Sequence, residues 1–218
     1  MARPGKKTPE AWRQEILDAA KELFVSNGYA ETSVSDIMNA VGGAKGVFYR
    51  YFQSKEALMH ALGNQMFFEN NPFELVRGRT DLNGLEKIRA VLLLNSGDET
   101  RNGINLQAAS ILKDPQILAA AVDENRRVLT PLWQELLEEG RRDGSIKTEY
   151  ARELSELLPL VNFWLLPQVF PGAEADVRRK YRFVMEVLAC MGLPVFDGAL
   201  AEYAEKFAAG VSREGREA

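Results

Sequence analysis

The chain has 218 residues, 46% of them hydrophobic and 27% charged, which is the composition of a folded globular protein with one large or two smaller domains. This composition excludes a disordered or low-complexity chain. The net charge of −4, taken over the whole chain, argues against a nucleic-acid partner.

Several function classes are disfavoured by what the sequence lacks. No apolar run reaches the ~18 residues that span a bilayer, and no apolar segment follows the basic N-terminus as it does in a secretory signal. The single cysteine, Cys190, and the single histidine, His60, argue against a disulfide framework, a metal site and a catalytic triad. We therefore expect a cytoplasmic protein with no membrane association, no cofactor and no metal, in which Cys190 is inert core.

Basic residues are concentrated near the N-terminus. Residues 1–60 carry eight Lys and Arg against seven Asp and Glu, a net charge of +1, whereas residues 61–218 carry nineteen against twenty-four, a net charge of −5. Arg3, Lys6 and Lys7 precede the first acidic residue of the chain. The sequence therefore indicates a small basic head and a larger acidic body.

The first predicted helix has clear start and stop signals. Thr8 is a typical N-cap, and Pro9 fits the first helical position because its missing N–H has no partner there in any case. Apolar residues then recur at helical spacing. Asn27 and Gly28 form a left-handed stop signal, so we expect the helix to end there.

Two short helices joined by a glycine turn are predicted next. Ser33 and Asp36 form the pattern of a capping box, and the helix that they start is broken by the glycines at 42–43. A third helix is expected over about 44–51, and Ser54 caps a fourth, longer one. A short helix, a glycine turn and another short helix is the layout of a helix-turn-helix.

Helical patterns continue to the C-terminus, without convincing β alternation or an internal repeat. The expected breaks lie at 70–72, 83–84, 114–115, 143–144 and 171–172, with a kink or division at Pro131 and a last helix at 199–209. We therefore predict an all-α protein, in which residues 1–54 form an N-terminal arm and a three-helix head, and residues 55–218 form a larger helical domain.

Residues 45–52 place different chemistry on the two sides of the predicted third helix. At 100° per residue, Phe48, Tyr51 and Phe52 share one side, which we assign to the core. The other side carries Gly46, Tyr49 and Arg50, with Val47 at its edge and Lys45 near the boundary. A cation, a phenol and a glycine can contact phosphate, hydrogen-bond base edges and allow a close approach to the major groove. The amides that begin the next helix, together with Lys55, can meet a phosphate.

Three segments carry a resemblance to a known family. Residues 28–37 (GYAETSVSDI), 41–52 (VGGAKGVFYRYF) and 54–58 (SKEAL) closely resemble, in order and spacing, the DNA-binding head of TetR-type bacterial transcriptional regulators. The resemblance covers about residues 10–60. It implies an all-helical homodimer with one DNA-binding head per subunit and a C-terminal body that senses a ligand and forms the dimer.

The resemblance also implies roles by position. The groove-facing positions that it implies are Lys45, Gly46, Val47, Arg50 and Tyr51. It implies a DNA contact from the second helix by Ser35, and phosphate contacts by Tyr49 and Lys55. The family often has a serine where this chain has Ala44 and a threonine where it has Val47, so two hydroxyl contacts are missing. Val47 can instead touch a thymine methyl group, which changes the operator that we expect.

Each of these assignments has a plainer alternative. Tyr49 and Tyr51 can be core aromatics, and for Tyr51 the two interpretations are equally weighted because it lies beside Phe48 on the helix. Arg50 can be a solvated surface charge. The basic arm, residues 1–7, either follows the DNA backbone or is only a solvated terminus.

Apolar stripes in the body predict a pair of helices that two subunits complete as a four-helix bundle, with a monomer core as the alternative. The stripes consist of Leu154, Leu157, Leu158, Val161 and Leu165 on one helix and Tyr181, Val184, Met185 and Leu188 on the next. A ligand pocket needs apolar walls with a few polar groups. The candidates are Phe67, Phe68, Asn105, Gln107, Trp133, Asn162, Phe163 and Trp164, and for each one simple core packing is the more common explanation.

The leading hypothesis is a DNA-binding regulator, most simply a repressor released from a palindromic operator by a small-molecule effector. An enzyme is the second hypothesis, but the sequence offers no catalytic triad, metal cluster or nucleotide-binding loop. A helical adaptor is the third. The basic and aromatic open face of residues 45–51 argues against an adaptor, which has no need of it.

Overall fold

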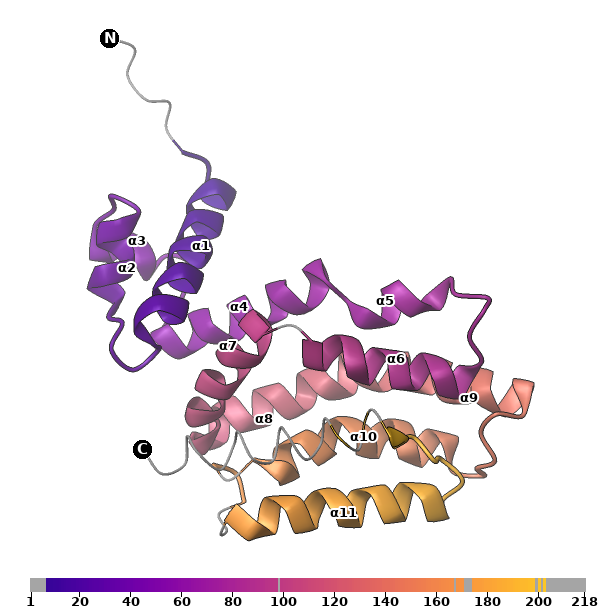
Figure 1. Ribbon diagram of the computed structural model, residues 1–218. Helices are drawn as coiled ribbons and strands as arrows, with labels where there is room; N and C mark the ends of the chain where they lie inside the picture. Colours follow the sequence, from indigo (N-terminus) through magenta and orange to yellow (C-terminus); the bar gives the residue numbers. More distant parts are fainter. Residues whose placement is uncertain are drawn as a thin grey trace. The chain divides into compact units, whose positions relative to one another are not determined.

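The structure, a computed structural model, describes residues 7–97, 99–166, 168–170, 174–198, 200 and 202 (Figure 1). Every element of regular secondary structure in this part of the chain is a helix, so the predicted all-α fold class is confirmed. Within the same residues, no helix is both long enough and apolar enough to cross a lipid bilayer. Of the predicted helix at 199–209, the structure describes only Leu200 and Glu202, and both are helical. The predicted break at 171–172 and the arm residues Arg3 and Lys6 lie outside the described residues.

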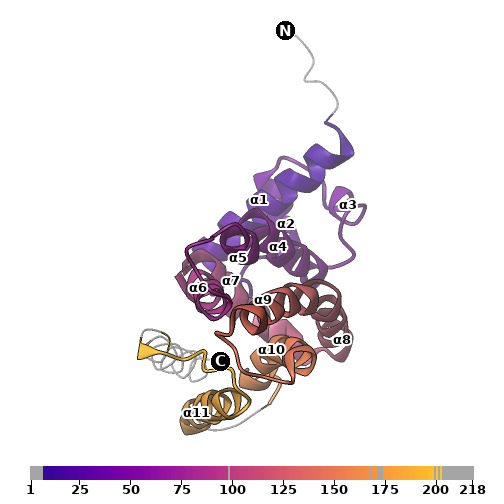
Figure 2. The same ribbon diagram turned by 90° about the vertical axis from the view of Figure 1, so that its right-hand side faces the viewer.

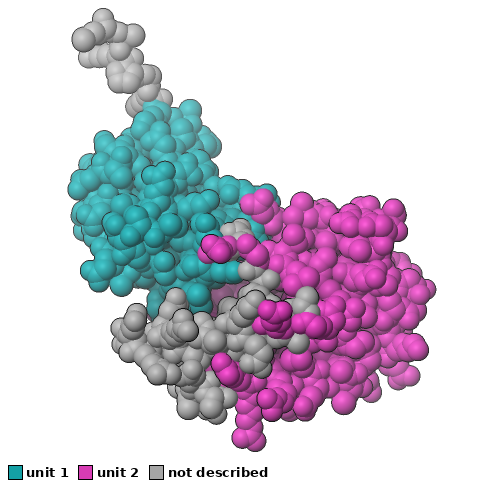
Figure 3. All heavy atoms as spheres, in the orientation of Figure 1, with its two compact units in different colours: residues 1–69, 100–111 teal, residues 70–99, 112–218 magenta. Residues whose placement is uncertain are grey.

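By its packing the chain divides into two compact units, which Figure 3 shows in teal and magenta. The first unit comprises residues 1–69 and 100–111, and the second comprises the remainder. The chain therefore passes from one unit to the other three times. The first unit extends beyond residue 54, since it includes further residues on both sides of the segment 70–99. The assignment of separate functions to residues 1–54 and 55–218 stays a prediction.

The first four helices of the first unit begin close to where the sequence predicts, and the start of the fifth was not predicted. These helices are α1 (Pro9–Asn27), α2 (Val34–Ala40), α3 (Lys45–Phe48), α4 (Lys55–Glu69) and α7 (Glu99–Ala109), of which only the first residue falls in the second unit. The Thr8 hydroxyl accepts a hydrogen bond from the Ala11 amide at 3.2 Å, and α1 ends at Gly28 with φ +87°. Ser33 and Asp36 form both hydrogen bonds of the capping box that starts α2.

The third helix is shorter than predicted. The expected helix over 44–51 is α-helical only as far as Phe48, and the chain then forms tight turns. The Arg50 amide donates to the Val47 carbonyl and the Tyr51 amide to the Phe48 carbonyl, so both bonds span three residues instead of four. This tightening ends α3 before the loop that leads to α4.

A single apolar core holds the helices of the first unit together. Phe24 of α1, Ile37 of α2, Phe48 of α3 and Leu58 of α4 are all fully buried in one cluster. Ile104 of α7 is buried in the same cluster, although about 30 residues of sequence separate α7 from the end of α4. The short α2 and α3 are thus stabilised by packing, because helices of one or two turns are not stable alone.

The second unit is a stack of neighbouring helices, visible in Figures 1 and 2. It contains α5 (Pro72–Arg77), α6 (Gly84–Gly97), α8 (Pro115–Glu124), α9 (Thr130–Asp143), α10 (Ala151–Leu165) and α11 (Glu174–Cys190), and a 3-10 turn (Ser110–Lys113) precedes α8. In this stack α6 packs on α9, α9 on α10, and α10 on α11. The predicted breaks at 70–72, 83–84, 114–115 and 143–144 all separate helices, and are therefore confirmed.

Pro131 divides a long helical segment, as the sequence predicts. A π-helical turn, Asn125–Leu129, separates α8 from α9 immediately before this proline. Pro131 has no amide hydrogen to donate to the carbonyl of residue 127. The Thr130 amide donates to the Asn125 carbonyl five residues back, which is the wider π register.

One prediction about the core is wrong. Cys190 is exposed at the end of α11, whereas we expected it to be buried. The reason is helical geometry: Val184 and Leu188 are buried on one side of α11, and Cys190 is about 200–240° from them at 100° per residue.

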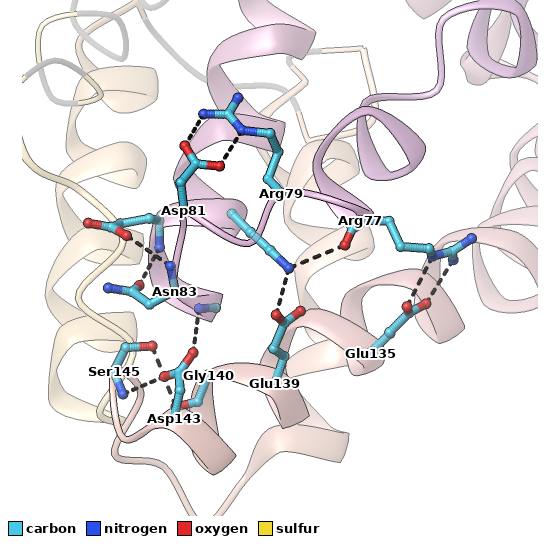
Figure 4. Close-up of polar contacts among 12 residues, drawn as sticks. Arg77, Arg79, Asp81, Asn83, Glu135, Glu139, Gly140, Asp143 and Ser145 are labelled. Carbon is cyan, nitrogen blue, oxygen red and sulfur yellow. Dashed lines mark hydrogen bonds and ion pairs between the residues drawn. The ribbon is translucent and has the colours of Figure 1, made fainter.

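Polar contacts tie the start of α6 to the end of α9 (Figure 4). The Lys87 side chain is only 5% exposed, and its ammonium lies 2.6 Å from the Glu139 carboxylate. Asp143 accepts hydrogen bonds from the Gly84 amide at 2.7 Å and from Ser145. The bonds from Ser145, and then that from Gly84, hold the pKa of the Asp143 carboxyl below its ordinary value. This carboxylate therefore caps α6 from another helix.

Gly84 and Gly140 allow the backbones of α6 and α9 to approach closely at the same place. A Cβ atom added at Gly84 would lie 2.2 Å from the Gly140 backbone nitrogen, a distance that no side-chain movement can relieve. Neither glycine has a positive φ, so the close approach, and not backbone conformation, requires the small residue.

We expect Gly84→Ala to lower the free energy of unfolding by about 1–3 kcal/mol, because α6 and α9 must separate to admit the methyl group. Gly97→Ala is the matched control on the same helix, since a Cβ at Gly97 meets nothing within 4 Å. Denaturant unfolding of both variants measures the difference. Equal stability of the two variants would contradict the packing described for Gly84.

Candidate nucleic-acid interface

The short helix α3 has a buried side and an open side. Phe48 is fully buried, and Phe52, just after the helix, is 4% exposed. On the open side Lys45, Gly46 and Arg50 are exposed, and Tyr49 is 53% exposed. The burial of Phe48 therefore fixes the direction in which the polar groups of α3 point.

The other predicted contact residues of this region occupy intermediate or flanking positions. Ser35 is exposed near the start of α2. Val47 and Tyr51 are half-buried and pack against the core cluster, so both contribute to the core as well as to the surface. The Tyr49 ring contacts the Phe48 ring edge-on, at 5.3 Å between centroids, and Tyr49 as a whole is exposed.

The cationic side chains on the open side of α3 bind no other group in the part of the chain that the structure describes. Neither the Lys45 ammonium nor the Arg50 guanidinium forms a hydrogen bond or an ion pair with any residue that the structure describes. Gly46 lies between them in the sequence, and a Cβ added there would meet nothing within 4 Å. The face thus combines two uncompensated charges with an open stretch of backbone, which suits phosphate and base edges.

Lys55 has a different environment from Lys45. Its ammonium donates hydrogen bonds to the Tyr29 carbonyl at 2.7 Å and to the Thr32 carbonyl at 2.9 Å. It also lies 4.1 Å from the centre of the Tyr29 ring. Lys55 therefore ties the loop before α2 to the start of α4, and its contact with a phosphate stays a prediction.

The Tyr29 side chain completes this cluster. Its hydroxyl donates to the Glu56 carboxylate at 3.1 Å. Burial, and then the neighbouring Glu56 charge, raise the pKa of Tyr29 above its ordinary value. A hydrogen bond from Ser54 lowers the pKa of Glu56, so at neutral pH the pair is a phenol and a carboxylate.

The described end of the basic arm folds back on α1. Lys7 forms an ion pair with Glu15 and lies 4.5 Å from the centre of the Trp12 ring. Both partners belong to the first half of α1. This one cation of the predicted arm is therefore held against the helix.

The predicted pocket residues are distributed over both units. In the first unit, Phe67 is half-buried, Phe68 and Asn105 are exposed, and the Gln107 side chain is hydrogen-bonded to backbone groups. In the second unit, Trp133 is buried, Asn162 is exposed, and Phe163 and Trp164 are half-buried. Trp133 packs edge-on against Phe73, at 4.8 Å between ring centroids, and is part of the core. Their joint role as a pocket stays a prediction.

An open apolar groove of about 480 Å³ runs along α10 and α11, the two helices that lie side by side in Figures 1 and 2. Phe163 and Trp164 are among its lining residues, together with Leu118 and Val122 of α8. All its lining side chains are apolar. The groove is rimmed by exposed apolar side chains, of which Leu157 and Leu160 are each 42% exposed and Phe183 is 56% exposed.

The predicted stripes of the body are divided between core and surface. Leu154, Leu165, Val184 and Leu188 are buried within the second unit, which agrees with the monomer-core alternative for these residues. Leu157 of the same stripe is exposed. The exposed apolar surface instead centres on neighbouring positions of α10 and α11.

Comparison with known proteins agrees with the geometry of the first unit. A profile of the family described as "Bacterial regulatory proteins, tetR family" matches residues 16–62, which span most of α1, all of α2 and α3, and the first half of α4. This N-terminal part of the chain is therefore similar to the TetR family. The fold therefore has an N-terminal helix-turn-helix, formed by α2 and α3, followed by a larger helical domain.

Individual relatives match the chain over different lengths. The activator DhaS of Lactococcus lactis is 37% identical over 86 residues, which are 39% of this chain and 43% of that protein. YvdT of Bacillus subtilis is 37% identical over 79 residues, 36% of this chain and 39% of that protein. The chain thus spans about two fifths of the length of these two relatives. The repressor KstR2 of Rhodococcus jostii is 28% identical over 183 residues, 76% of this chain and 83% of that protein.

Solved structures share the fold at low sequence identity. GusR of Salmonella enterica is 18% identical, with a TM-score of 0.58 over 97% of this chain and 96% of that one. A transcriptional regulator of Cytophaga hutchinsonii is 19% identical, with a TM-score of 0.57 over 92% and 94% of the two chains. The likeness extends through both units.

Sequence reasoning missed two residues that organise this site. Tyr29 lies in the segment that carries the family resemblance, but nothing in the sequence indicates that Lys55 and Glu56 hold it. Gln107 was considered only as a pocket residue. Its partners, Phe24 and Tyr29, lie 83 and 78 positions away, and no local pattern signals contacts at that separation.

We expect Lys55→Met to lower the free energy of unfolding by about 1–3 kcal/mol, because it leaves the Tyr29 and Thr32 carbonyl groups without their charged donor. Lys45→Met is the matched control, since Lys45 is exposed and has no such partners. Thermal unfolding followed by circular dichroism measures both. A Lys55→Met variant as stable as Lys45→Met would show that Lys55 does not stabilise this loop.

Proposed function

We propose that this protein is a sequence-specific DNA-binding transcriptional regulator, which represses transcription until a small-molecule effector releases it from a palindromic operator. The observation that carries the proposal is the open side of α3, where Lys45, Gly46, Tyr49 and Arg50 are exposed opposite the buried Phe48. The match of residues 16–62 to the TetR family supports the same conclusion. No enzymatic role is part of the proposal.

In this proposal each side chain has a task set by its chemistry. Lys45 and Arg50 face the groove, where Arg50 reads a guanine edge with its paired donors, and the Tyr49 hydroxyl contacts a phosphate beside the groove. Val47 is partly buried against the core, and the exposed part of its side chain packs against a thymine methyl group. Ser35, exposed near the start of α2, contacts the backbone of the same groove.

Two copies of the chain are needed to read a palindrome. A dimer would place two α3 helices in successive major grooves, about 34–36 Å apart. We propose that the exposed apolar face of α10 and α11 forms the dimer. Leu157, Leu160 and Phe183 are all at least 42% exposed there, and a large exposed apolar patch marks a protein contact in most cases. A second copy presenting the same face would cover it and complete a four-helix bundle.

The effector acts in this proposal by shifting a conformational equilibrium. A ligand that binds better to a state with the wrong spacing of the two heads weakens DNA binding, and by linkage DNA weakens effector binding by the same factor. Of the residues predicted for its site, we keep those of the second unit, which are Trp133, Asn162, Phe163 and Trp164. An operator on the chromosome also implies a cytoplasmic location.

The relatives include both an activator and a repressor of transcription. DhaS is described as an activator and KstR2 as a repressor. Repression is the simpler proposal because a dimer on an operator blocks access to the promoter without further contacts. A reporter gene behind the bound fragment measures the direction.

We expect the purified protein to bind one fragment of the DNA upstream of its own gene in the presence of excess unrelated DNA. Arg50→Ala should lose about 1–3 kcal/mol of discrimination between that fragment and unrelated DNA, because a base-edge contact is removed. Arg152→Ala is the control, since Arg152 is an exposed arginine of the second unit. Fluorescence anisotropy at physiological salt measures all three proteins.

Two results would contradict this proposal in different ways. Unchanged discrimination by Arg50→Ala would remove Arg50 from the reading residues but keep the regulator. If the unaltered protein selects no sequence, either from its own upstream DNA or from a random library, the proposed function itself is wrong.

We expect Phe183→Glu to convert the dimer into a monomer, because it buries a charge at the centre of the proposed contact. Phe68→Glu is the matched control, since Phe68 in the first unit is 59% exposed and Phe183 is 56% exposed. Sedimentation velocity measures the mass of each. A dimer that persists in Phe183→Glu would place the subunit contact elsewhere.

A further inference from the structure

Helix α7 belongs to the first unit although its flanking sequence belongs to the second. The chain leaves the first unit after residue 69, returns at residue 100 and leaves again after residue 111. Ile104 and Ala109 of α7 are buried, Ile104 in the core cluster of the first unit, and the Arg101 guanidinium donates to the Met66 carbonyl at 3.0 Å. The segment that joins the two units is therefore firmly packed within the first.

Gln107 of α7 connects this helix to the end of α1. Its side-chain oxygen accepts a hydrogen bond from the Tyr29 amide at 2.8 Å, and its side-chain nitrogen donates to the Phe24 carbonyl at 3.2 Å. The two backbone groups lie on either side of Gly28, where α1 ends and the chain turns. One amide side chain thus bridges the turn with both of its polar ends.

The last carbonyl groups of a helix have no hydrogen-bond donor within the helix, and the amide of a residue beyond the helix end has no acceptor there. The Phe24 carbonyl and the Tyr29 amide therefore need partners from elsewhere in the protein. The Phe24 carbonyl also accepts from the Gly28 amide at 3.1 Å, so Gln107 supplies its second bond. Tyr29 is half-buried, and an unpaired amide there would be costly. Gln107 therefore stabilises this particular geometry of the turn.

The turn that Gln107 holds leads directly to the helix-turn-helix. Only four residues separate Gly28 from Ser33, the N-cap of α2. Within these residues the Thr32 hydroxyl donates to the Gly28 carbonyl at 2.8 Å, and Lys55 binds the Tyr29 and Thr32 carbonyls from the start of α4. The start of α2 is consequently fixed by α7 on one side of the turn and by α4 on the other.

The same contacts argue against the sequence-based interpretation of Gln107. A pocket residue needs a polar end that is available to a ligand. Both ends of the Gln107 amide bind backbone groups of the first unit. Asn105, two residues earlier on α7, is exposed and has no such contacts.

We propose that Gln107 is a positioning residue for the DNA-reading helices: by bridging Phe24 and Tyr29 it makes DNA affinity depend on the position of α7. This inference rests on the proposed function. The chain enters and leaves α7 from the second unit, so a displacement of either connection acts on the Gln107 bridge. The bridge is then the step at which a change in the body reaches α2 and α3.

The experiment compares Gln107→Met with Asn105→Met. Both variants place the same unbranched apolar side chain on α7, but only the first removes the bridge. We expect Gln107→Met to bind the selected upstream DNA fragment about five- to tenfold more weakly, and Asn105→Met to bind it normally. The slope of affinity against salt concentration should be unchanged in both, because no phosphate contact is removed.

A second measurement separates positioning from a general loss of stability. Hydrogen exchange followed by NMR should show faster exchange of the Tyr29 amide in Gln107→Met, with buried core amides of α1 and α4 unaffected. Gln107→Glu keeps the length and the acceptor but replaces the donor to the Phe24 carbonyl with an oxygen. This variant should retain most of the protection of the Tyr29 amide and should lie between the unaltered protein and Gln107→Met in DNA affinity.

The outcomes are distinct. Equal DNA affinity of Gln107→Met and Asn105→Met overturns the inference while leaving the proposed function intact. Uniformly faster exchange throughout the first unit of Gln107→Met, with no recovery in Gln107→Glu, also overturns it, since Gln107 would then be a stability residue only. If the unaltered protein selects no DNA sequence, the proposed function fails and the inference fails with it.

Discussion

The burial of Phe48 is the interaction on which the candidate interface depends. A helix as short as α3 has too few internal hydrogen bonds to be stable alone, so its orientation comes from the side chain that it buries. Phe48 is fully buried with Phe24, Ile37 and Leu58, one residue from each of the other N-terminal helices. Because Lys45, Gly46 and Arg50 are not on that side, the same packing turns them towards solvent.

Both units add long-range polar contacts at helix ends, where backbone groups lack helical partners. In the first unit, Gln107 and Lys55 bind the backbone on either side of the turn after α1. In the second, the Asp143 carboxylate accepts from the amide of Gly84, the first residue of α6. Such contacts define the angles between helices more narrowly than apolar packing does, because a hydrogen bond weakens steeply with distance and direction.

The errors of sequence reasoning have identifiable physical causes. The helix predicted over 44–51 ends at Phe48, because three-residue hydrogen bonds at Arg50 and Tyr51 tighten the chain before its loop. The apolar stripes of the body predict either a subunit contact or a monomer core. Four of their nine residues are buried within the second unit, because a helix that packs on two neighbours has apolar residues on more than one side. Periodicity identifies such a helix but does not say which neighbour each side meets.

The sequence by itself determined where most helices begin and end, the all-α class, the resemblance of the N-terminal segment to the TetR family and the open side of α3. These features are local: caps, glycines and prolines act within a few residues, and the helix-turn-helix pattern fits within about 50. Only the tertiary structure decided that α7 joins the first unit, that Gln107 and Lys55 hold the turn before α2, and that Cys190 is exposed. Those features depend on contacts between residues many positions apart, and such contacts leave no periodic signal in one sequence.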